Sequence, residues 1–160
     1  MRRLVLAVSL FAVAAGVTVA VAQNADAIKQ RREAMRVIAR AGGDPFKMTR
    51  GEAPFNLAAV QAVLKAIEDN APKFKAAFPD NSKTGSTEAT AKVWEARAEF
   101  NAIIDKWVAD AKAAAGTIKD EASFKAEYPK LTQTCGNCHG NRGGYAPGLS
   151  DSFKKMQEPL

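Results

Sequence analysis

The chain has 160 residues, 47% of them hydrophobic, which is enough for one domain with a buried core. Its 23 Lys and Arg residues outnumber its 17 Asp and Glu residues, but they are spread along the chain rather than clustered with aromatic residues, which argues against nucleic-acid binding. The two cysteines lie three positions apart and leave none for a disulfide framework.

The first 22 residues have the pattern of a signal peptide. Met1-Arg2-Arg3 is positively charged, an apolar stretch of small residues follows, and Ala20-Val21-Ala22 fits the rule for cleavage sites. A transmembrane anchor is the alternative, but the stretch is near the lower length limit for spanning a bilayer. We therefore expect export, cleavage before Gln23 and a mature domain of residues 23–160 without a stable membrane anchor. That domain has 21 basic and 17 acidic residues, a net charge of +4, which suits acidic protein partners.

The first helix of the mature domain is predicted over residues 24–41, where apolar residues recur at helical spacing. Asn24 or Asp26 can cap its first turn. Gly42-Gly43 is expected to end the helix, and Asp44-Pro45 to prevent it from resuming. We therefore expect residues 46–54 to form a loop.

The second helix is predicted to start after an Asn56 cap and to run to Phe74 or beyond, with Pro72 kinking or breaking it. A polar surface connection is expected over residues 81–90, followed by a third helix from Glu88 or Thr90 to Ala115.

The fourth helix is predicted from Asp120 through the two cysteines. Pro129 suggests a kink, or a helix in two pieces. Glycine-rich residues 140–148 are expected to be loop, and residues 150–157 a short closing helix. Four amphipathic helices with no convincing strand predict an all-α protein, an antiparallel four-helix bundle with its cofactor inside.

The chemistry of the chain is concentrated in one pentapeptide, Cys135-Gly136-Asn137-Cys138-His139. Cys-x-x-Cys-His is the attachment signature of c-type haem. On a helix, the two thiols and the imidazole share one face, so both sulfurs can form thioethers with the haem vinyl groups while His139 reaches the iron. We therefore expect one covalent haem c per chain, held by Cys135 and Cys138, with His139 as an axial iron ligand.

Three other functions of a Cys-x-x-Cys pair fit less well. A thiol–disulfide redox centre usually accompanies a βαβ pattern, which is missing from this sequence. A structural zinc site usually needs four Cys or His ligands, whereas the whole chain has two Cys and one His. A plain disulfide would leave His139 unexplained.

A C-terminal Cys-x-x-Cys-His after three other helices resembles the class II c-type cytochromes, which comprise cytochrome c′ and its low-spin, methionine-ligated relatives. Gly51-Glu52-Ala53-Pro54-Phe55, Phe78-Pro79-Asp80 and Trp94-Glu95 add to this similarity. The resemblance implies a periplasmic four-helix bundle with one covalent haem, often a homodimer through the first two helices. One departure is the glycine-rich insert at residues 140–149, which separates His139 from the tail that usually follows it in the family.

The resemblance also assigns two residues of the first helix. Met35 falls at the family's distal position, sixteen residues before Gly51, where it is either the sixth iron ligand or an apolar cover of the open iron face. Arg31 falls where cytochrome c′ has an arginine close to a haem propionate. Of the other methionines, Met1 leaves with the signal peptide, Met48 is expected in a loop, and Met156 lies near the C-terminus.

Two functions follow from these expectations. The first is electron transfer with redox protein partners, in which an iron bound by His139 and Met35 cycles between Fe(III) and Fe(II). The alternative is a five-coordinate, cytochrome c′-type haem that binds nitric oxide or carbon monoxide. An enzyme is not expected, because no second histidine is present to act as a distal acid–base group.

Overall fold

The computed structural model describes residues 2–139, with side chains described from residue 24 onward. It contains five α-helices and one 3-10 turn: α1 (Arg2–Thr49), α2 (Leu57–Ala76), η1 (Asp80–Ser82), α3 (Lys92–Glu95), α4 (Arg97–Thr117) and α5 (Glu121–His139). The glycine-rich loop and the closing helix expected after His139 lie outside these residues.

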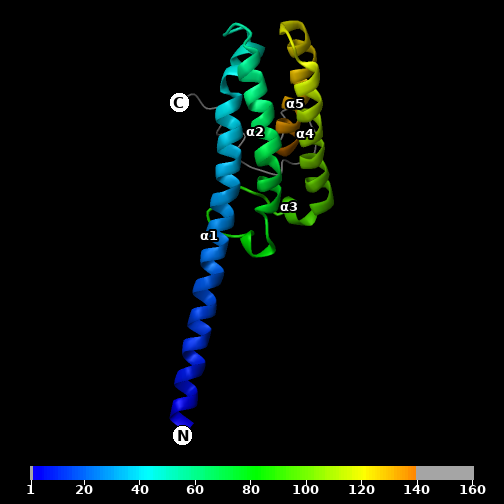
Figure 1. Cartoon of the computed structure of the whole chain (residues 1–160). Helices are drawn as coiled ribbons and strands as arrows, with labels where there is room; N and C mark the ends of the chain where they lie inside the picture. Colours follow the sequence, from blue (N-terminus) through cyan, green and yellow to red (C-terminus); the bar gives the residue numbers. More distant parts are fainter. Residues whose placement is uncertain (1, 140–160) are drawn as a thin grey trace.

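The four long helices alternate in direction and form an up-down-up-down bundle (Figure 1). α1 packs against α2, α2 against α4, and α4 against α5. The N-terminal part of α1 extends beyond the other three helices (Figure 1). The predicted all-α four-helix bundle is therefore confirmed. No helix within the described residues combines the length and the apolar character needed to cross a membrane.

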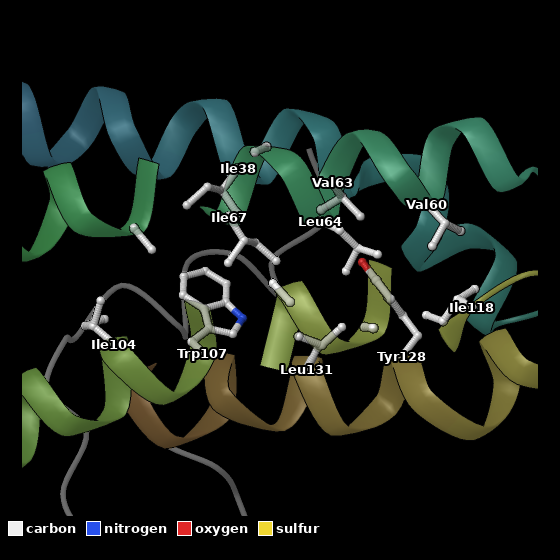
Figure 2. Close-up of a cluster of buried hydrophobic side chains, with 14 of the residues drawn as sticks. Ile38, Val60, Val63, Leu64, Ile67, Ile104, Trp107, Ile118, Tyr128 and Leu131 are labelled. Carbon is white, nitrogen blue, oxygen red and sulfur yellow. The ribbon is translucent and has the colours of Figure 1, made fainter. Parts of the chain in front are cut away.

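The core lies along the bundle axis and draws on all four long helices. Figure 2 shows Leu64 and Ile67 of α2 facing Trp107 of α4 and Leu131 of α5. Burial of a large apolar side chain stabilises the fold by roughly 1.5–3 kcal/mol, so these contacts dominate the stability. Towards the end of the bundle near α3, Phe78 packs edge-on against Phe74 and Phe100, with ring centroids 5.0 and 4.9 Å away.

The expected end of the first helix at Gly42-Gly43 is wrong, because α1 continues through Pro45 to Thr49. A Cβ atom at Gly42 would lie 3.3 Å from the Phe46 ring and 3.7 Å from Cγ2 of Val63. Ile38 before these residues and Met48 after them are both buried in the core, and this packing outweighs the low helix propensity of Gly and Pro.

Gly51 is the glycine that ends α1. Its φ is +73°, its N–H donates to the Met48 carbonyl (3.1 Å), and the next N–H, of Glu52, donates to the Lys47 carbonyl (2.9 Å). This pair of bonds is a Schellman cap, which needs a left-handed residue that glycine adopts at little cost. Met48 consequently lies in the last turn of α1 and is buried, rather than in the expected loop.

The predicted start of a helix at residue 24 is also corrected. α1 is continuous from Arg2, so neither Asn24 nor Asp26 caps a helix in the full-length chain. Asn24 instead donates from Nδ2 to the Thr84 carbonyl, at 3.1 Å. The signal peptide over residues 1–22 stays a prediction.

The second and fourth predicted helices are confirmed, and neither is broken by its proline. Oδ1 of Asn56 accepts a hydrogen bond from the Ala59 N–H (3.1 Å), which is the expected N-cap of α2. α2 continues through Pro72, and α5 through Pro129. Both prolines lie on exposed faces, while the apolar residues on the opposite faces hold each helix against the core.

The predicted third helix is two helices, because Ala96 interrupts it with φ −107° and ψ 44°. α3 starts at Lys92, later than expected. The interruption places two side chains on either side of it near Phe78: the Trp94 ring lies 5.8 Å from the Phe78 ring, and Nη2 of Arg97 donates to the Phe78 carbonyl at 2.7 Å. Trp94 thus packs on Phe78, which follows α2.

Candidate haem-attachment site

The pentapeptide forms the last turn of α5, so its register is that of a regular helix. Cys138 lies three residues and His139 four residues after Cys135, and these spacings bring all three side chains to one face. Both cysteines are free thiols, partly buried, and pack against the central apolar core. The geometry therefore brings together the three residues that the sequence predicts to hold the haem.

The surroundings of the two cysteines fit a large flat apolar group. The backbones of α1 and α5 approach each other far less than those of the other neighbouring helices in the described bundle. Both cysteines pack against the apolar core, so a haem attached to them would lie against apolar side chains. Thr134 and Gly136 are buried beside the thiols, so the macrocycle would also be shielded from water along α5.

Burial dominates the electrostatics of the motif. It raises the pKa of the Cys135 thiol and, with the nearby Cys135, raises the pKa of Cys138 to about 12. A thiol–disulfide redox centre instead needs a lowered thiol pKa, so this environment suits thiols that become neutral thioethers. Burial also lowers the pKa of His139, while the negative charge of Glu88 acts in the opposite direction. A neutral imidazole is the form that binds iron.

Met35 lies on α1, half-buried and packed against the same core as the two cysteines. It stands fourteen residues before the end of α1, and Cys135 stands fourteen residues after the start of α5. These two helix ends lie at the same end of the bundle (Figure 1). At about 1.5 Å per residue, both residues lie about 21 Å from that end, and hence at a similar height.

Met48, the other methionine in the described part of the mature domain, lies at a different height. It is thirteen residues beyond Met35 on the same helix, a distance of about 20 Å. The loop position expected for Met48 is wrong, but its distance along α1 from Met35 leaves Met35 as the methionine level with Cys135.

Arg31 lies one turn before Met35 and is 4% exposed. Its guanidinium donates to the Ala77 carbonyl (3.3 Å), to Oγ and the carbonyl of Ser82 (3.1 and 3.2 Å) and to Oγ1 of Thr87. It also lies over the Phe78 ring, 4.6 Å from the centroid. Burial, with the neighbouring Arg32, lowers its pKa. These acceptors are neutral, so the structure gives Arg31 a structural role, and its contact with a propionate stays a prediction.

The connection between α2 and α3 contributes residues that the sequence pattern did not indicate. Ser82 is fully buried although it belongs to the polar stretch expected on the surface. Thr87 accepts hydrogen bonds from both Arg31 and the Ala89 N–H, the latter at 3.1 Å. Glu88 follows directly and acts electrostatically on His139. The hydrogen bonds that join this connection to α1 link residues about fifty positions apart, so local sequence does not reveal them.

Comparison with known proteins agrees with the covalent haem predicted from the sequence. The family model described as Cytochrome C′ matches residues 26–141, a range that contains Arg31, Met35 and the whole pentapeptide.

The chain is 45% identical over 121 residues to a cytochrome c′ of Rhodopseudomonas palustris, covering 75% of this chain and 82% of that protein. It is 34% identical over 113 residues to a cytochrome c-556 of Agrobacterium fabrum, covering 70% and 77%. A solved structure of cytochrome c′ from Rhodopseudomonas palustris superposes with a TM-score of 0.69 at 43% identity, covering 72% of this chain and 94% of that one.

Proposed function

Because this chain belongs to the cytochrome c′ family, within the class II c-type cytochromes, we propose that it is a periplasmic electron-transfer protein whose haem iron is bound by His139 and Met35. As a member of this family the chain carries covalent haem c, one per chain. Cys135 and Cys138 are the residues that would form its thioethers, and the iron then supplies a one-electron Fe(III)/Fe(II) couple.

The position of Met35 is the observation on which electron transfer depends. A thioether on α1 at the height of Cys135 would supply the second protein ligand to an iron bound by His139. Ligation by His and Met raises the reduction potential, and filling both axial positions leaves no open site for a substrate. A buried haem in a rigid bundle also limits the reorganisation that accompanies electron transfer.

Gas binding is the second candidate, and the comparison with relatives favours it. Identity is higher to the Rhodopseudomonas palustris cytochrome c′ (45%) than to the Agrobacterium fabrum cytochrome c-556 (34%). In this alternative, Met35 covers the iron without binding it, and nitric oxide or carbon monoxide occupies the vacant position.

Carbon monoxide binding to the reduced protein separates the two functions. If the Met35 sulfur occupies the sixth position, carbon monoxide must displace it, so binding is slow and weak. Met35→Leu keeps a similar apolar volume but removes the sulfur, and this variant should bind carbon monoxide faster and more tightly. Equal binding by the unmodified protein and by Met35→Leu would reject ligation and favour the gas-binding function.

The proposed location and partners follow from the same family and from charge. The signal-peptide pattern of residues 1–22 and the haem motif favour the periplasm. A net charge of +4 on residues 23–160 favours acidic redox proteins that dock transiently near the haem edge.

We also propose a homodimer through α1 and α2, which sedimentation at micromolar concentration would test. No catalytic role is proposed, because the one histidine of the chain is the proximal ligand.

A further inference from the structure

We propose that the acidic redox partner docks on the outward face of α1, on a row of four exposed cations that we call the basic stripe: Lys29, Arg36, Arg40 and Lys47. The inference rests on the proposed function in one respect, that the chain exchanges electrons with an acidic protein, and it names the surface that recognises this protein.

The basic stripe is straight because its spacing follows the helix. Counted from Lys29, the other three members lie seven, eleven and eighteen residues further along α1. At 3.6 residues per turn, all four therefore fall within about 40° of one another around the helix, in a row about 27 Å long. Ile38, nine residues after Lys29, lies on the opposite side of α1 and is buried in the core. The stripe thus faces away from the core.

α1 holds most of the excess positive charge of the mature domain. Its residues 24–49 include six basic and three acidic residues, a net charge of +3, whereas residues 23–160 together have +4. The remainder of the domain is therefore nearly balanced. An approaching acidic surface is attracted mainly to α1, because the field around a protein follows its local excess of charge.

The stripe is accessible to a partner. Figure 1 shows α1 at one outer edge of the bundle, where it packs against α2. Arg36 and Lys47 pair with neighbouring carboxylates at 2.6 and 3.2 Å, yet their side chains remain 54% and 55% exposed. Lys29 and Arg40 are exposed and form no ion pair within the described residues. Exposed pairs contribute little stability, so a partner's carboxylates can replace them at little cost.

The stripe also lies at the height of the haem-attachment turn. Met35 directly precedes Arg36 in α1 and is level with Cys135 of α5. An α-helix with its side chains is about 10–12 Å in diameter. A protein docked on the stripe is therefore separated from the interior of the bundle by the thickness of one helix, and electron exchange needs no opening between helices.

An acidic protein fits this surface better than a second copy of the chain does. Two copies that met on the stripe would bring like charges together, which disfavours association. The proposed homodimer would then use other faces of α1 and α2. An acidic protein instead is attracted along the whole row, which speeds encounter and suits the small, transient interfaces of electron transfer.

The test is the rate at which ferricyanide, an anion that stands in for the acidic partner, oxidises the ferrous holoprotein. The haem iron loses one electron and becomes ferric, and ferricyanide gains it and becomes ferrocyanide. Arg36→Gln/Arg40→Gln should slow this reaction severalfold at about 0.01 M ionic strength but little at about 1 M, because the Debye length falls from about 30 to about 3 Å. With tris(phenanthroline)cobalt(III), a cationic one-electron oxidant, the same variant should react faster.

The matched control is Lys106→Gln/Lys112→Gln on α4, which packs against α2 and α5. It removes the same number of charges from exposed residues, and Lys106 is paired with Asp110 much as Arg36 is paired with Glu33. The control should change both rates far less. Midpoint potentials measured on each variant separate a change in driving force from a change in docking. Equal rate changes in the two double variants would overturn the proposal.

A polymeric acid tests docking by a macromolecule. Poly-L-glutamate should bind the unmodified protein at low salt and slow its oxidation by ferricyanide, because it covers the stripe. Arg36→Gln/Arg40→Gln should lose most of this inhibition, whereas the α4 control should keep it. Sedimentation of the same proteins tests for a second copy on the stripe: a stripe variant that dissociates a dimer would overturn the proposal.

Failure of the docking surface can be distinguished from failure of the proposed electron-transfer ligation. The ferric spectrum reports axial ligation, whereas the salt dependence of the rates reports docking. A high-spin, five-coordinate protein with a rate change specific to the stripe would reject Met35 ligation and keep the stripe. A low-spin protein with equal changes in both double variants would keep Met35 ligation and reject the stripe.

Discussion

At the scale of single residues, the two cysteines determine whether the haem is a permanent part of the protein. Cys135→Ala and Cys138→Ala should each leave one thioether, and the double variant should release its haem to acidified organic solvent. The unmodified protein should retain its haem under the same extraction, measured by absorbance of the organic and aqueous phases. Release of haem from the unmodified protein would show that the motif does not attach it covalently.

Arg31 is the residue whose loss should affect stability most directly. Arg31→Leu leaves the buried acceptors on Ala77 and Ser82 without a donor, which should lower the free energy of unfolding by about 2–3 kcal/mol. Denaturant unfolding measures this loss. Arg32→Leu is the control, because the exposed Arg32 bonds only to the exposed Ser86 carbonyl among the contacts described, and a loss well below 1 kcal/mol is expected. Equal losses in the two variants would show that the buried bonds of Arg31 contribute nothing specific.

The predicted propionate contact of Arg31 needs a different measurement. A guanidinium near a propionate offsets its negative charge, so removing it should lower the midpoint potential. Arg31→Lys keeps the charge but loses the planar donor geometry, and should change the potential less than Arg31→Leu. An unchanged potential in Arg31→Leu would remove Arg31 from the haem environment and leave only its structural role.

At the scale of helices, packing decided where α1 ends. Gly42-Gly43 and Pro45 are the usual signals of a helix end, and sequence reasoning placed the end there. The burial of Ile38 and Met48 in the core has no local sequence signal, because it depends on residues of the other helices. Gly51 ends the helix through its left-handed φ and its Schellman hydrogen bonds. Sequence reasoning could have predicted this end only if it had first predicted that the helix continues past Pro45.

The start of α5 supplies a test of capping and of pH dependence together. Oδ1 of Asp120 accepts from the Ser123 N–H at 2.8 Å, and Oγ of Ser123 accepts from the Asp120 N–H at 3.1 Å. The bonds from Ser123 lower the pKa of Asp120. A carboxylate with a lowered folded-state pKa stabilises the protein above its unfolded pKa, and that contribution disappears as the pH falls through the folded value.

Asp120→Asn keeps a side-chain acceptor at the cap but cannot titrate. The variant should therefore lose less thermal stability than the unmodified protein when the pH is lowered from 7 to below about 4, the ordinary pKa of Asp. Thermal unfolding of both proteins at each pH measures the difference, and changes at other groups are common to both. Identical pH dependence would mean that the cap does not depend on the charge of Asp120.

At the scale of the whole molecule, the sequence predicted the features that depend on residues close together in the chain. Helical periodicity was sufficient for the all-α bundle, and the predicted haem residues Cys135, Cys138 and His139 lie within about one turn of α5. The connection between α2 and α3 was taken for a surface loop because its composition is polar. The burial of Ser82 and the hydrogen bonds from Arg31 to Ser82 and Thr87 join residues about fifty positions apart in sequence, which no local pattern reports.

The spin state of the ferric protein tests the central claim most directly, because it reports whether the iron has two axial protein ligands. Electron paramagnetic resonance and absorption spectra of the ferric holoprotein should show low-spin iron with His139 and Met35 bound. Met35→Ala should convert it to a high-spin, gas-accessible haem, whereas Arg32→Leu, an exposed change on the same helix, should leave it low-spin. A high-spin, five-coordinate spectrum from the unmodified ferric protein would contradict the account and make Met35 only a cover over a gas-binding iron.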